Sequence, residues 1–533
     1  MSSPKAEARR RPRPRLYRLH RWIGLVVAVV GTLVFFSGVL ATFASEIDAW
    51  AARAPQYPAI GELEGFDLDR ALAAATPSEF EQAHIAQDHG EPLLAYFETP
   101  SAVEGEPAHA RGLSLDPETL EVFERREGTP GEVQAPRPHD RLAAFIIELH
   151  VFLLLPRTLG LLVTGLLAFG LLALLVSGVW VHQPTAEKLR RRPRKTRLRV
   201  FAGDLHTLVG SWTLPYTAII ALTGAFFCFS STVVLPVLTL ARYGGDRAEM
   251  LADLVPEVPV EPAAGPSVRA LDPMLRDALA RSEGASFRSL SLEHWGGEQA
   301  RATVVLERES AWGDERLRYV YDGHDGRFLA DKPEVGAVPS VSSAALELID
   351  ALHFGTLLGR LTQVLWVLLG LATCGLSMTG LLVYARRQIK AQSTVEDAPR
   401  SARAAATLAV ALSGGLVACC PLVLASWAVA CAAQLDDPAT AMTATLLLGL
   451  AAAAALGWTL TLERALALTL GCAGLGFLGA PALVALANGL SLFELWSRGP
   501  QPWPIAGDLL ALALALGCLA GARALLLNPR TLP

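Results

Sequence analysis

The chain has 533 residues, of which 52% are hydrophobic and only 18% are charged. Soluble domains carry about 25% charged residues, so this composition excludes an ordinary soluble protein and predicts a membrane protein. The formal net charge of −5 says little about partners, and we expect no nucleic-acid partner. Lys and Arg are clustered along the chain, and their distribution is more informative than their sum.

The seven cysteines lie in apolar stretches or beside them, and none lies in the two long polar segments. A disulfide framework in those polar segments is therefore excluded. The chain has no Cys-x-x-Cys-His motif, so any haem would be held without a covalent attachment. We interpret the adjacent pair Cys419 and Cys420 as helix packing, because adjacent residues on a helix do not face the same way.

Eight stretches have the roughly 20 apolar residues that a helix needs to cross a bilayer. We expect these spans at 22–44, 150–182, 206–238, 353–385, 404–433, 441–462, 465–486 and 505–526. Two long polar segments, 45–149 and 239–352, interrupt the series. The sequence thus predicts an α-helical polytopic membrane protein with two extramembrane domains. A linker at 386–403 precedes the last four spans, which fill 404–526, and a short tail follows at 527–533.

Basic residues indicate the orientation of the spans. They cluster in 1–21, in 183–205 and at Arg386, Arg387 and Lys390. Alternating spans place all three clusters on one side, which the positive-inside rule makes cytoplasmic. Both termini are then cytoplasmic, and both polar segments lie outside. A cleaved signal peptide is the alternative for the first stretch. Its apolar run is long for a signal, and it has a counterpart within the chain, so we expect it to be retained.

The first and third spans begin with the same motif. Leu19-His20-Arg21-Trp22-Ile23-Gly24 corresponds to Leu205-His206-Thr207-Leu208-Val209-Gly210. A hydroxyl–glycine pair follows 17 and 18 residues after each histidine, as Ser37-Gly38 and as Thr223-Gly224. At about 100° per residue, the offsets of 4 and 18 return to the face of the histidine. The glycines therefore leave room on that face for a flat ligand or for another helix.

The second and fourth spans correspond in the same way. Leu149-His150 precedes Arg157, and Leu352-His353 precedes Arg360, with seven residues from histidine to arginine in both cases. Seven residues are two helical turns, so we expect each arginine on the face of its histidine. The two spans end in Ser177-Gly178 and Thr379-Gly380, one residue out of register. The chain is therefore an internal duplication of a span, a domain and a second span.

The two polar segments also correspond. Each opens with a helical stretch, at 66–75 and at 273–281. Each ends with alternating apolar residues around an Asp-, Pro- or Gly-containing turn, at 112–123 and at 318–329, which predicts a β-hairpin. We expect two α+β domains.

The matched histidines are placed to hold haem. His20 and His206 fall at the cytoplasmic side of the expected spans, and His150 and His353 fall at the outer side. Two histidines at one depth on symmetry-related helices are arranged to ligate one b-type haem from opposite sides. This pattern predicts two haem b groups per chain, held by the pairs His20/His206 and His150/His353, with Gly24 and Gly210 providing space and Arg157 and Arg360 neutralising propionates. Proton relays, substrate sites and interfacial residues are the alternatives for any single histidine, and the fourfold match favours ligands.

The remaining histidines are weaker candidates. His182 has no counterpart in the fourth span and is a possible alternative ligand. The six in the polar segments are expected to be solvated, although His84 and His89 are possible metal contacts; they are His84, His89, His109, His139, His294 and His324. The chain has no Walker loop, no dinucleotide fingerprint, no zinc spacing and no nucleophile elbow. Electrons must therefore come from a donor outside the chain.

With these motifs, the chain resembles the PepSY-associated transmembrane family of bacterial iron-regulated membrane proteins over about residues 15–390. The two outer hairpins are similar to PepSY domains. Members of this family include inner-membrane ferric-siderophore reductases with two b haems. The resemblance therefore implies a bacterial inner-membrane location and electron transfer to a ferric siderophore in the periplasm. The histidines match the pattern of the family, whereas their pairing is our geometric inference.

The last four spans, within 404–526, extend beyond this family pattern. They are rich in Ala, Leu and Gly. We expect a fused membrane module, akin to small proteins found with iron-uptake systems, whose role is open.

Three functions remain open on the sequence. In the first, a quinol or a cytoplasmic reductase reduces the inner haem, the electron passes to the outer haem, and siderophore-bound Fe(III) is reduced. Hard oxygen ligands hold Fe(II) less tightly, so this reduction releases iron. In the second, the chain is a siderophore or metal permease, with Pro156 and Pro215 as possible helix breaks. In the third, PepSY-like domains restrain a periplasmic protease without any cofactor.

Overall fold

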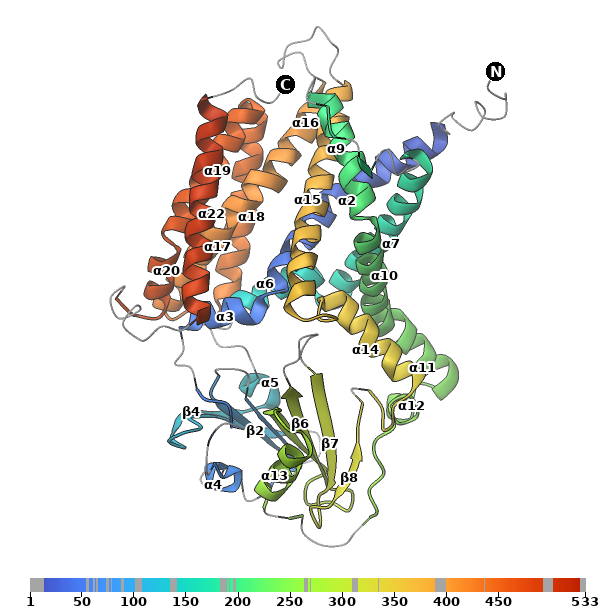
Figure 1. Cartoon of the computed structure of the whole chain (residues 1–533), viewed down its shortest axis with the longest axis vertical. Helices are drawn as coiled ribbons and strands as arrows, with labels where there is room; N and C mark the ends of the chain where they lie inside the picture. The colour runs from blue at the N-terminus through green and yellow to red at the C-terminus, as the bar shows by residue number, and fades with distance from the viewer. Residues whose placement is uncertain are drawn as a thin grey trace. The chain divides into compact units, whose positions relative to one another are not determined.

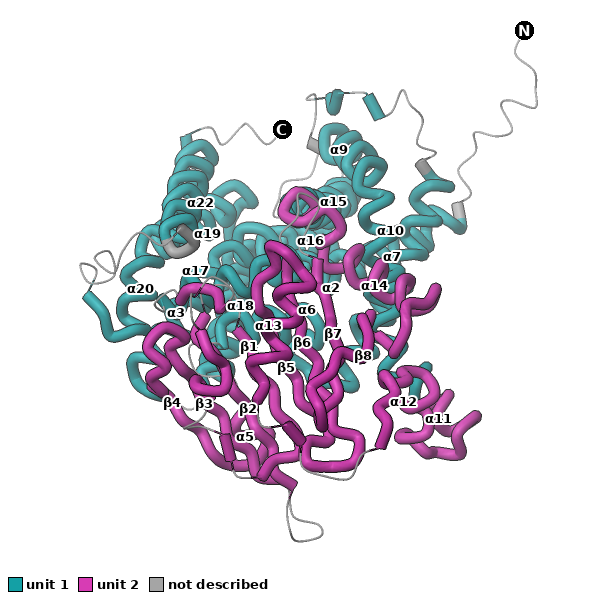
Figure 2. The backbone as a smooth tube through the Cα atoms, turned by 60° about the horizontal axis from the view of Figure 1, so that its bottom comes forward, with its two compact units in different colours: residues 1–53, 137–235, 363–533 teal, residues 54–136, 236–362 magenta. Residues whose placement is uncertain are grey.

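The computed structural model divides the chain into two compact units, coloured separately in Figure 2. The helical unit comprises residues 1–53, 137–235 and 363–533, and the sheet unit comprises residues 54–136 and 236–362. The structure describes residues 14–53, 57–60, 63, 66–72, 76–77, 79–87, 91–100, 108–134, 141–182, 189–190, 192–194, 198–262, 267–268, 270–308, 315–333, 335–388, 399–435, 437–491 and 502–527.

The duplicated part of the chain contains the first set of helices, among which the candidate membrane spans are Arg15–Ala41, Arg157–Val181, Leu214–Tyr243 and Arg360–Gln388. The helices of this set are α2 (Pro14–Ala41), α3 (Ala44–Ala52), α6 (Arg141–Phe152), α7 (Arg157–His182), α9 (Leu198–Trp212), α10 (Leu214–Phe229), the π-helix η2 (Ser230–Val234), α11 (Leu235–Tyr243), α14 (Val341–Phe354) and α15 (Arg360–Gln388). The hydrocarbon core of a bilayer holds no water that could bond to backbone N–H and C=O groups. A helix satisfies these groups internally, so an apolar segment that crosses the bilayer forms a helix.

The C-terminal module is also helical (Figure 1). Its elements are α16 (Arg400–Val410), the π-helix η3 (Ala411–Gly415), α17 (Leu416–Ala432), α18 (Pro438–Thr459), α19 (Leu462–Leu478), α20 (Ala480–Ala487) and α22 (Pro502–Leu527). Among the described residues, seven helices are long and apolar enough to cross a membrane. The pair α19–α20, bent by 50°, makes an eighth if it forms one span. The expected polytopic membrane architecture with about eight spans is confirmed.

The second span begins later than the sequence suggested. His150 lies on α6, which ends at Phe152, and α7 begins only at Arg157. Leu153 and Leu154 between them adopt left-handed φ angles of 54° and 57°. Pro156 has no N–H to donate and disfavours a helical residue before it, so the helix restarts after it. The prediction that Arg157 lies two turns along the helix of His150 is therefore wrong.

The fourth span has the same break. His353 lies on α14, which is closed by Gly355 in the left-handed conformation, with φ 72°. Glycine reaches this conformation without steric cost and is the usual residue at a helix end. The long helix α15 starts at Arg360, so the prediction of one helix from His353 to Arg360 is also wrong. In the third span, His206 lies on α9, and the apolar span begins after it at Leu214, beside Pro215.

The C-terminal module packs against the duplicated helices within the helical unit. One buried apolar cluster joins α2, α15, α16 and η3 through Ala28, Leu381, Ala409 and Leu412. Within the module, glycines bring helices close together: a Cβ at residue 474 would lie 2.7 Å from Leu519 Cγ. The expected four-helix module is thus packed against helices of both repeats and belongs to the same compact unit.

A buried ion pair strengthens this attachment. The Asp508 carboxylate on α22 accepts hydrogen bonds from Arg53 (2.6 Å) and from Trp50 Nε1 (3.0 Å) at the end of α3. Only 7% of the Arg53 side chain and 16% of the Asp508 side chain are exposed. Asn488 adds a bond from its amide to the Ala51 carbonyl oxygen at 2.8 Å. Because the pair is shielded from water, removal of one partner leaves an uncompensated buried charge.

We therefore expect Asp508→Leu to destabilise the protein strongly, by about 3–5 kcal/mol. The double variant Arg53→Leu/Asp508→Leu should recover most of this loss, because a buried pair replaced by apolar residues is often close to neutral. The measurement is the thermal denaturation midpoint of the detergent-purified chain. A double variant less stable than either single variant would contradict a coupled buried pair.

The sheet unit contains one antiparallel sheet of eight strands. They are β1 (Gln82–Ala86), β2 (Leu93–Thr99), β3 (His109–Leu115), β4 (Val122–Gly128), β5 (Ser286–Glu293), β6 (Arg301–Arg308), β7 (Glu315–Asp322) and β8 (Phe328–Asp331). Their order is β4-β3-β2-β1-β5-β6-β7-β8. Each polar segment contributes four strands, and the segments join where β1 pairs with β5, with Ile85 opposite Leu290. Both predicted hairpins are confirmed; the sequence did not predict that the two halves share one sheet.

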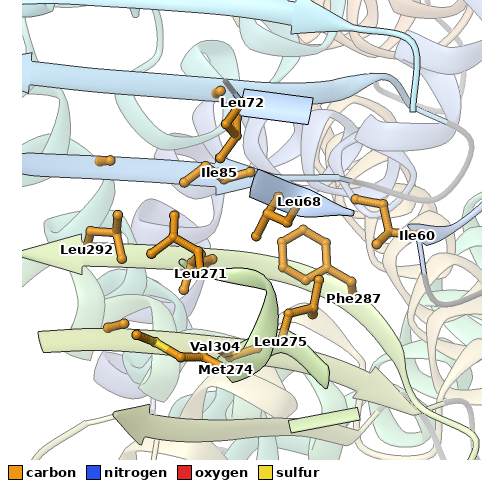
Figure 3. Packing of buried hydrophobic residues seen from close by; sticks show 14 of the residues in the cluster. Ile60, Leu68, Leu72, Ile85, Leu271, Met274, Leu275, Phe287, Leu292 and Val304 are labelled. Atoms are coloured by element: carbon orange, nitrogen blue, oxygen red, sulfur yellow. The ribbon is translucent and has the colours of Figure 1, made fainter. Parts of the chain in front are cut away.

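Two short helices, α4 (Leu68–Leu72) and α13 (Asp272–Arg281), cover one face of the sheet. Figure 3 shows the apolar core between them and the strands, in which Leu68, Ile85 and Leu275 are nearly fully buried. The two halves also cap each other's helices. Asp272 accepts a bond from Leu68 N at 3.0 Å, and Asp69 accepts one from Leu271 N at 2.6 Å. The remaining helices of this unit are α5 (Pro130–Val133), α11, α12 (Arg247–Leu254) and α14.

Candidate functional site

His20 on α2 lies against the end of α7. Its Nδ1 is 2.9 Å from the hydroxyl oxygen of Ser177. That hydroxyl donates its own proton to the Leu174 carbonyl oxygen at 3.2 Å, so it accepts from the imidazole. A Cβ at residue 178 would lie 3.3 Å from Cε1 of His20. The pair Ser177-Gly178 therefore gives the ring both an acceptor and a space.

His206 on α9 is held in the same way by α15. Its Nδ1 lies 3.0 Å from the Leu376 carbonyl oxygen and 3.2 Å from the Thr379 hydroxyl. A Cβ at residue 380 would lie 3.2 Å from Cε1 of the ring. The pair Thr379-Gly380 thus corresponds to Ser177-Gly178 in the other repeat.

His150 lies on α6 and packs against α2. Whereas His20 and His206 each contact the helix that ends their own repeat, His150 contacts the helix that begins it. Its Nδ1 is 2.9 Å from the Val34 carbonyl oxygen. A Cβ at residue 38 would lie only 2.7 Å from its Cε1. The hydroxyl of Ser37 donates to the Leu33 carbonyl oxygen at 2.7 Å. The glycines of three hydroxyl–glycine pairs therefore each face an imidazole from another helix, and in two of the pairs the hydroxyl also contacts the ring. Sequence reasoning missed this role, although the pairs recur at matched places.

These contacts define which ring nitrogen carries the proton. A carbonyl oxygen only accepts hydrogen bonds, so Nδ1 of His150 and of His206 must carry the proton. In the neutral ring, Nε2 then carries the lone pair. Metal-ligating histidines are oriented in this manner, with the second nitrogen donating to a carbonyl or another acceptor.

A cavity of about 490 Å³ lies within the helical unit and is lined by both His20 and His206. Its volume falls within the range of about 300–1,000 Å³ that is typical of ligand sites. Six glycines from four parts of the chain line it: Gly24, Gly31, Gly178, Gly203, Gly210 and Gly380. The structure therefore brings together at one cavity four of the residues selected from the sequence, namely His20, His206, Gly24 and Gly210.

The other predicted ligands are distributed differently. His150 belongs to the helical unit and His353 to the sheet unit, so their pairing stays a prediction. Arg157 starts α7, where its guanidinium carbon lies 5.6 Å from the centre of the Phe152 ring. His182 ends α7, and its side chain falls outside the described part of the chain, as do His89 and His139.

His84 lies at the junction of the two halves of the sheet. Its Nδ1 is 3.0 Å from the Ser291 hydroxyl across β1 and β5. Within the residues that the structure describes, no three His, Cys, Asp or Glu side chains gather as a metal site.

Comparison with known proteins identifies the architecture. The chain matches the model of the PepSY-associated TM region over residues 17–387. It belongs to this family. It is also 28% identical over 359 residues to "Uncharacterized protein PA4219" of Pseudomonas aeruginosa, an alignment that covers 64% of this chain and 86% of that protein. The family match ends within α15, so the PepSY-associated TM region holds the cavity, and α16–α22 lie outside the matched range.

The close approach of His150 to Gly38 makes this glycine sensitive to substitution. We expect Gly38→Ala to destabilise the protein by about 1–3 kcal/mol, because the new methyl group overlaps the imidazole. Gly375→Ala on α15 is the matched control, since a Cβ there meets no atom within 4 Å. Thermal denaturation of the two detergent-purified variants tests this difference. Equal denaturation midpoints would show that the imidazole does not rest on Gly38.

Proposed function

We propose that this chain is a di-haem b oxidoreductase of the bacterial inner membrane, which passes electrons across the bilayer to ferric siderophore iron in the periplasm. The observation that carries the proposal is the single cavity lined by both His20 and His206. Each of these imidazoles has its Nδ1 beside an oxygen acceptor of a neighbouring helix. One cavity is thus lined by two imidazoles of the kind that ligate a haem iron from its two sides.

The residues of the cavity fit a b-type haem. The glycines allow a flat macrocycle to approach the backbones of α2, α7, α9 and α15, and aliphatic side chains such as Leu171 and Val383 complete the walls. A bis-histidine haem supplies a one-electron carrier at this position. Ser177 and the Leu376 carbonyl oxygen fix the ring orientations and raise the basicity of the imidazoles.

The outer site rests on His150 and on the repeat. Its Nδ1 is bound to the Val34 carbonyl oxygen, so Nε2 carries the lone pair here as well. The duplication assigns His353 as the second ligand, because it follows Leu352 as His150 follows Leu149. His20 lies near the start of α2, and Gly38, which faces His150, lies near its end.

The basic residues indicate the orientation of the spans, and hence which side of the membrane faces the electron donor. Arg15, Arg18 and Arg21 at the start of α2 mark the His20 end as cytoplasmic under the positive-inside rule. With α19–α20 as one span, the eight spans place both termini on this side. A quinol or a cytoplasmic reductase supplies the electron at that side, because the chain has no nicotinamide or flavin motif of its own. Reduction to Fe(II) weakens binding by hard siderophore oxygens and releases the iron.

We expect the detergent-purified protein from haem-replete cells to contain two haem b per chain, with sharp α and β bands after dithionite reduction. Pyridine-haemochrome quantitation should give about one haem in His20→Ala, in His206→Ala and in the double variant, since both residues hold the same group. His20→Ala/His353→Ala should lose both. A colourless wild-type protein would overturn the proposal, and the permease or protease-regulator interpretation would replace it.

A second experiment tests the acceptor. Dithionite-reduced protein freed of excess reductant should be reoxidised on anaerobic mixing with a ferric siderophore, seen as loss of the α band and formation of an Fe(II) chelate. His353→Ala, which keeps the inner site, should be reduced normally and reoxidised more slowly. Reoxidation by oxygen alone, with no response to ferric siderophore, would remove siderophore iron as the substrate.

A further inference from the structure

One end of the cavity is lined by polar residues. They come from the first turns of α2, the last turn of α15, α9 and the segment that leads into α9: Tyr17, Arg21, Arg194, Asp204, Arg387 and Gln388. Arg194 and Asp204 form a bidentate ion pair, with N–O distances of 2.8 and 2.9 Å. The charges of these two residues offset each other, so they add little net charge to the wall.

Arg21 and Arg387 are the other two cations among these residues. In the part of the chain that the structure describes, no carboxylate lies within 4.0 Å of either guanidinium. Their guanidinium carbons lie over aromatic rings instead, at 5.4 Å from the Trp22 ring and 5.1 Å from the Tyr17 ring.

The Nε atom of Arg21 is buried and has no hydrogen-bond acceptor among the described residues. A buried N–H without an acceptor is costly, and native proteins rarely leave one unsatisfied. Together with the two cations, this atom indicates that an anionic group of a ligand belongs at this end of the cavity.

We propose that Arg21 and Arg387 bind the carboxylates of the ligand in this cavity, which under the proposed function are the propionates of the haem held by His20 and His206. A protoporphyrin has an apolar body and two carboxylates along one edge. The cavity has the complementary arrangement, with glycines and aliphatic side chains along its walls and two cations at one end. Charge-assisted bonds from an arginine to a carboxylate are short and strong. Arg157 and Arg360, which the sequence suggested as partners of propionates, do not line this cavity.

Topology offers a simpler reason for the same charges, because basic residues accumulate on the cytoplasmic side of any span. The chain provides controls that separate the two explanations. Arg18 and Arg386 lie on the same helix ends as Arg21 and Arg387, yet neither lines the cavity. Neutralising any of the four removes the same charge, so an effect confined to Arg21 and Arg387 reports ligand binding.

The test uses the full chain, purified from haem-deficient cells, and the fluorescence of metal-free protoporphyrin IX as the probe. Without a metal, this porphyrin reports carboxylate recognition separately from histidine ligation. We expect Arg21→Gln and Arg387→Gln each to weaken its binding roughly tenfold, as loss of a charge-assisted bond implies. Arg18→Gln and Arg386→Gln should bind as the wild type does. Binding of protoporphyrin dimethyl ester should be equal in all five proteins.

A readout on the haem-loaded protein accompanies this titration. Positive charge beside a haem favours its reduced state. The midpoint potential of the inner haem, which is recognised by its absence from His20→Ala, should therefore fall in Arg21→Gln and in Arg387→Gln. It should stay unchanged in the two controls.

The results distinguish the inference from the function on which it rests. If wild type binds porphyrin and all four arginine variants bind it equally, the carboxylate assignment is wrong while the haem proposal stands. If wild type binds neither haem nor porphyrin, both fail.

Discussion

Close contact between an imidazole ring and the backbone of another helix is the constraint on which the helical unit depends. A ring can approach a helix axis this closely only where the facing residue has no side chain. Glycine meets that need at positions 38, 178 and 380, and an oxygen acceptor from the same turn or the turn before it fixes the ring. In apolar surroundings, a ring N–H that loses this acceptor cannot bond to water instead. The loss therefore costs more free energy there than it would at a solvated position. These hydrogen bonds from imidazole rings are therefore specific polar contacts that position the helix pairs within largely apolar surfaces.

Much of this architecture was predictable from the sequence because it depends on local composition and spacing. Apolar length predicted the spans, and the matched offsets around His20 and His206 predicted residues that share a cavity. The partner of each glycine was not predictable, since periodicity reports which residues share a face of one helix. It does not report which neighbouring helix that face meets. Gly38 shares a face with His20 in the sequence, and the structure places it against His150.

Two other features escaped prediction for different physical reasons. The breaks before α7 and α15 fall within apolar sequence. Hydropathy does not report backbone conformation, so it did not predict the left-handed φ angles of Leu153 and Leu154. Arg21 and Arg387 were interpreted as topology signals, because charge alone does not distinguish a residue facing lipid headgroups from one lining a cavity. The buried Nε of Arg21 makes that distinction, and it is a property of three-dimensional packing.

The pairing of β1 with β5 has a consequence for how the duplication arose. Either half of the sheet by itself would end in a bare edge strand, which invites pairing with another chain. A protein with one copy of the repeat would satisfy that edge by joining a second copy of itself through the same strand, as two-fold symmetric dimers do. The present chain has the strand order that joining two such copies in one polypeptide would produce. Within one polypeptide the two halves need not stay identical, and Arg21 corresponds to Thr207 in the second repeat.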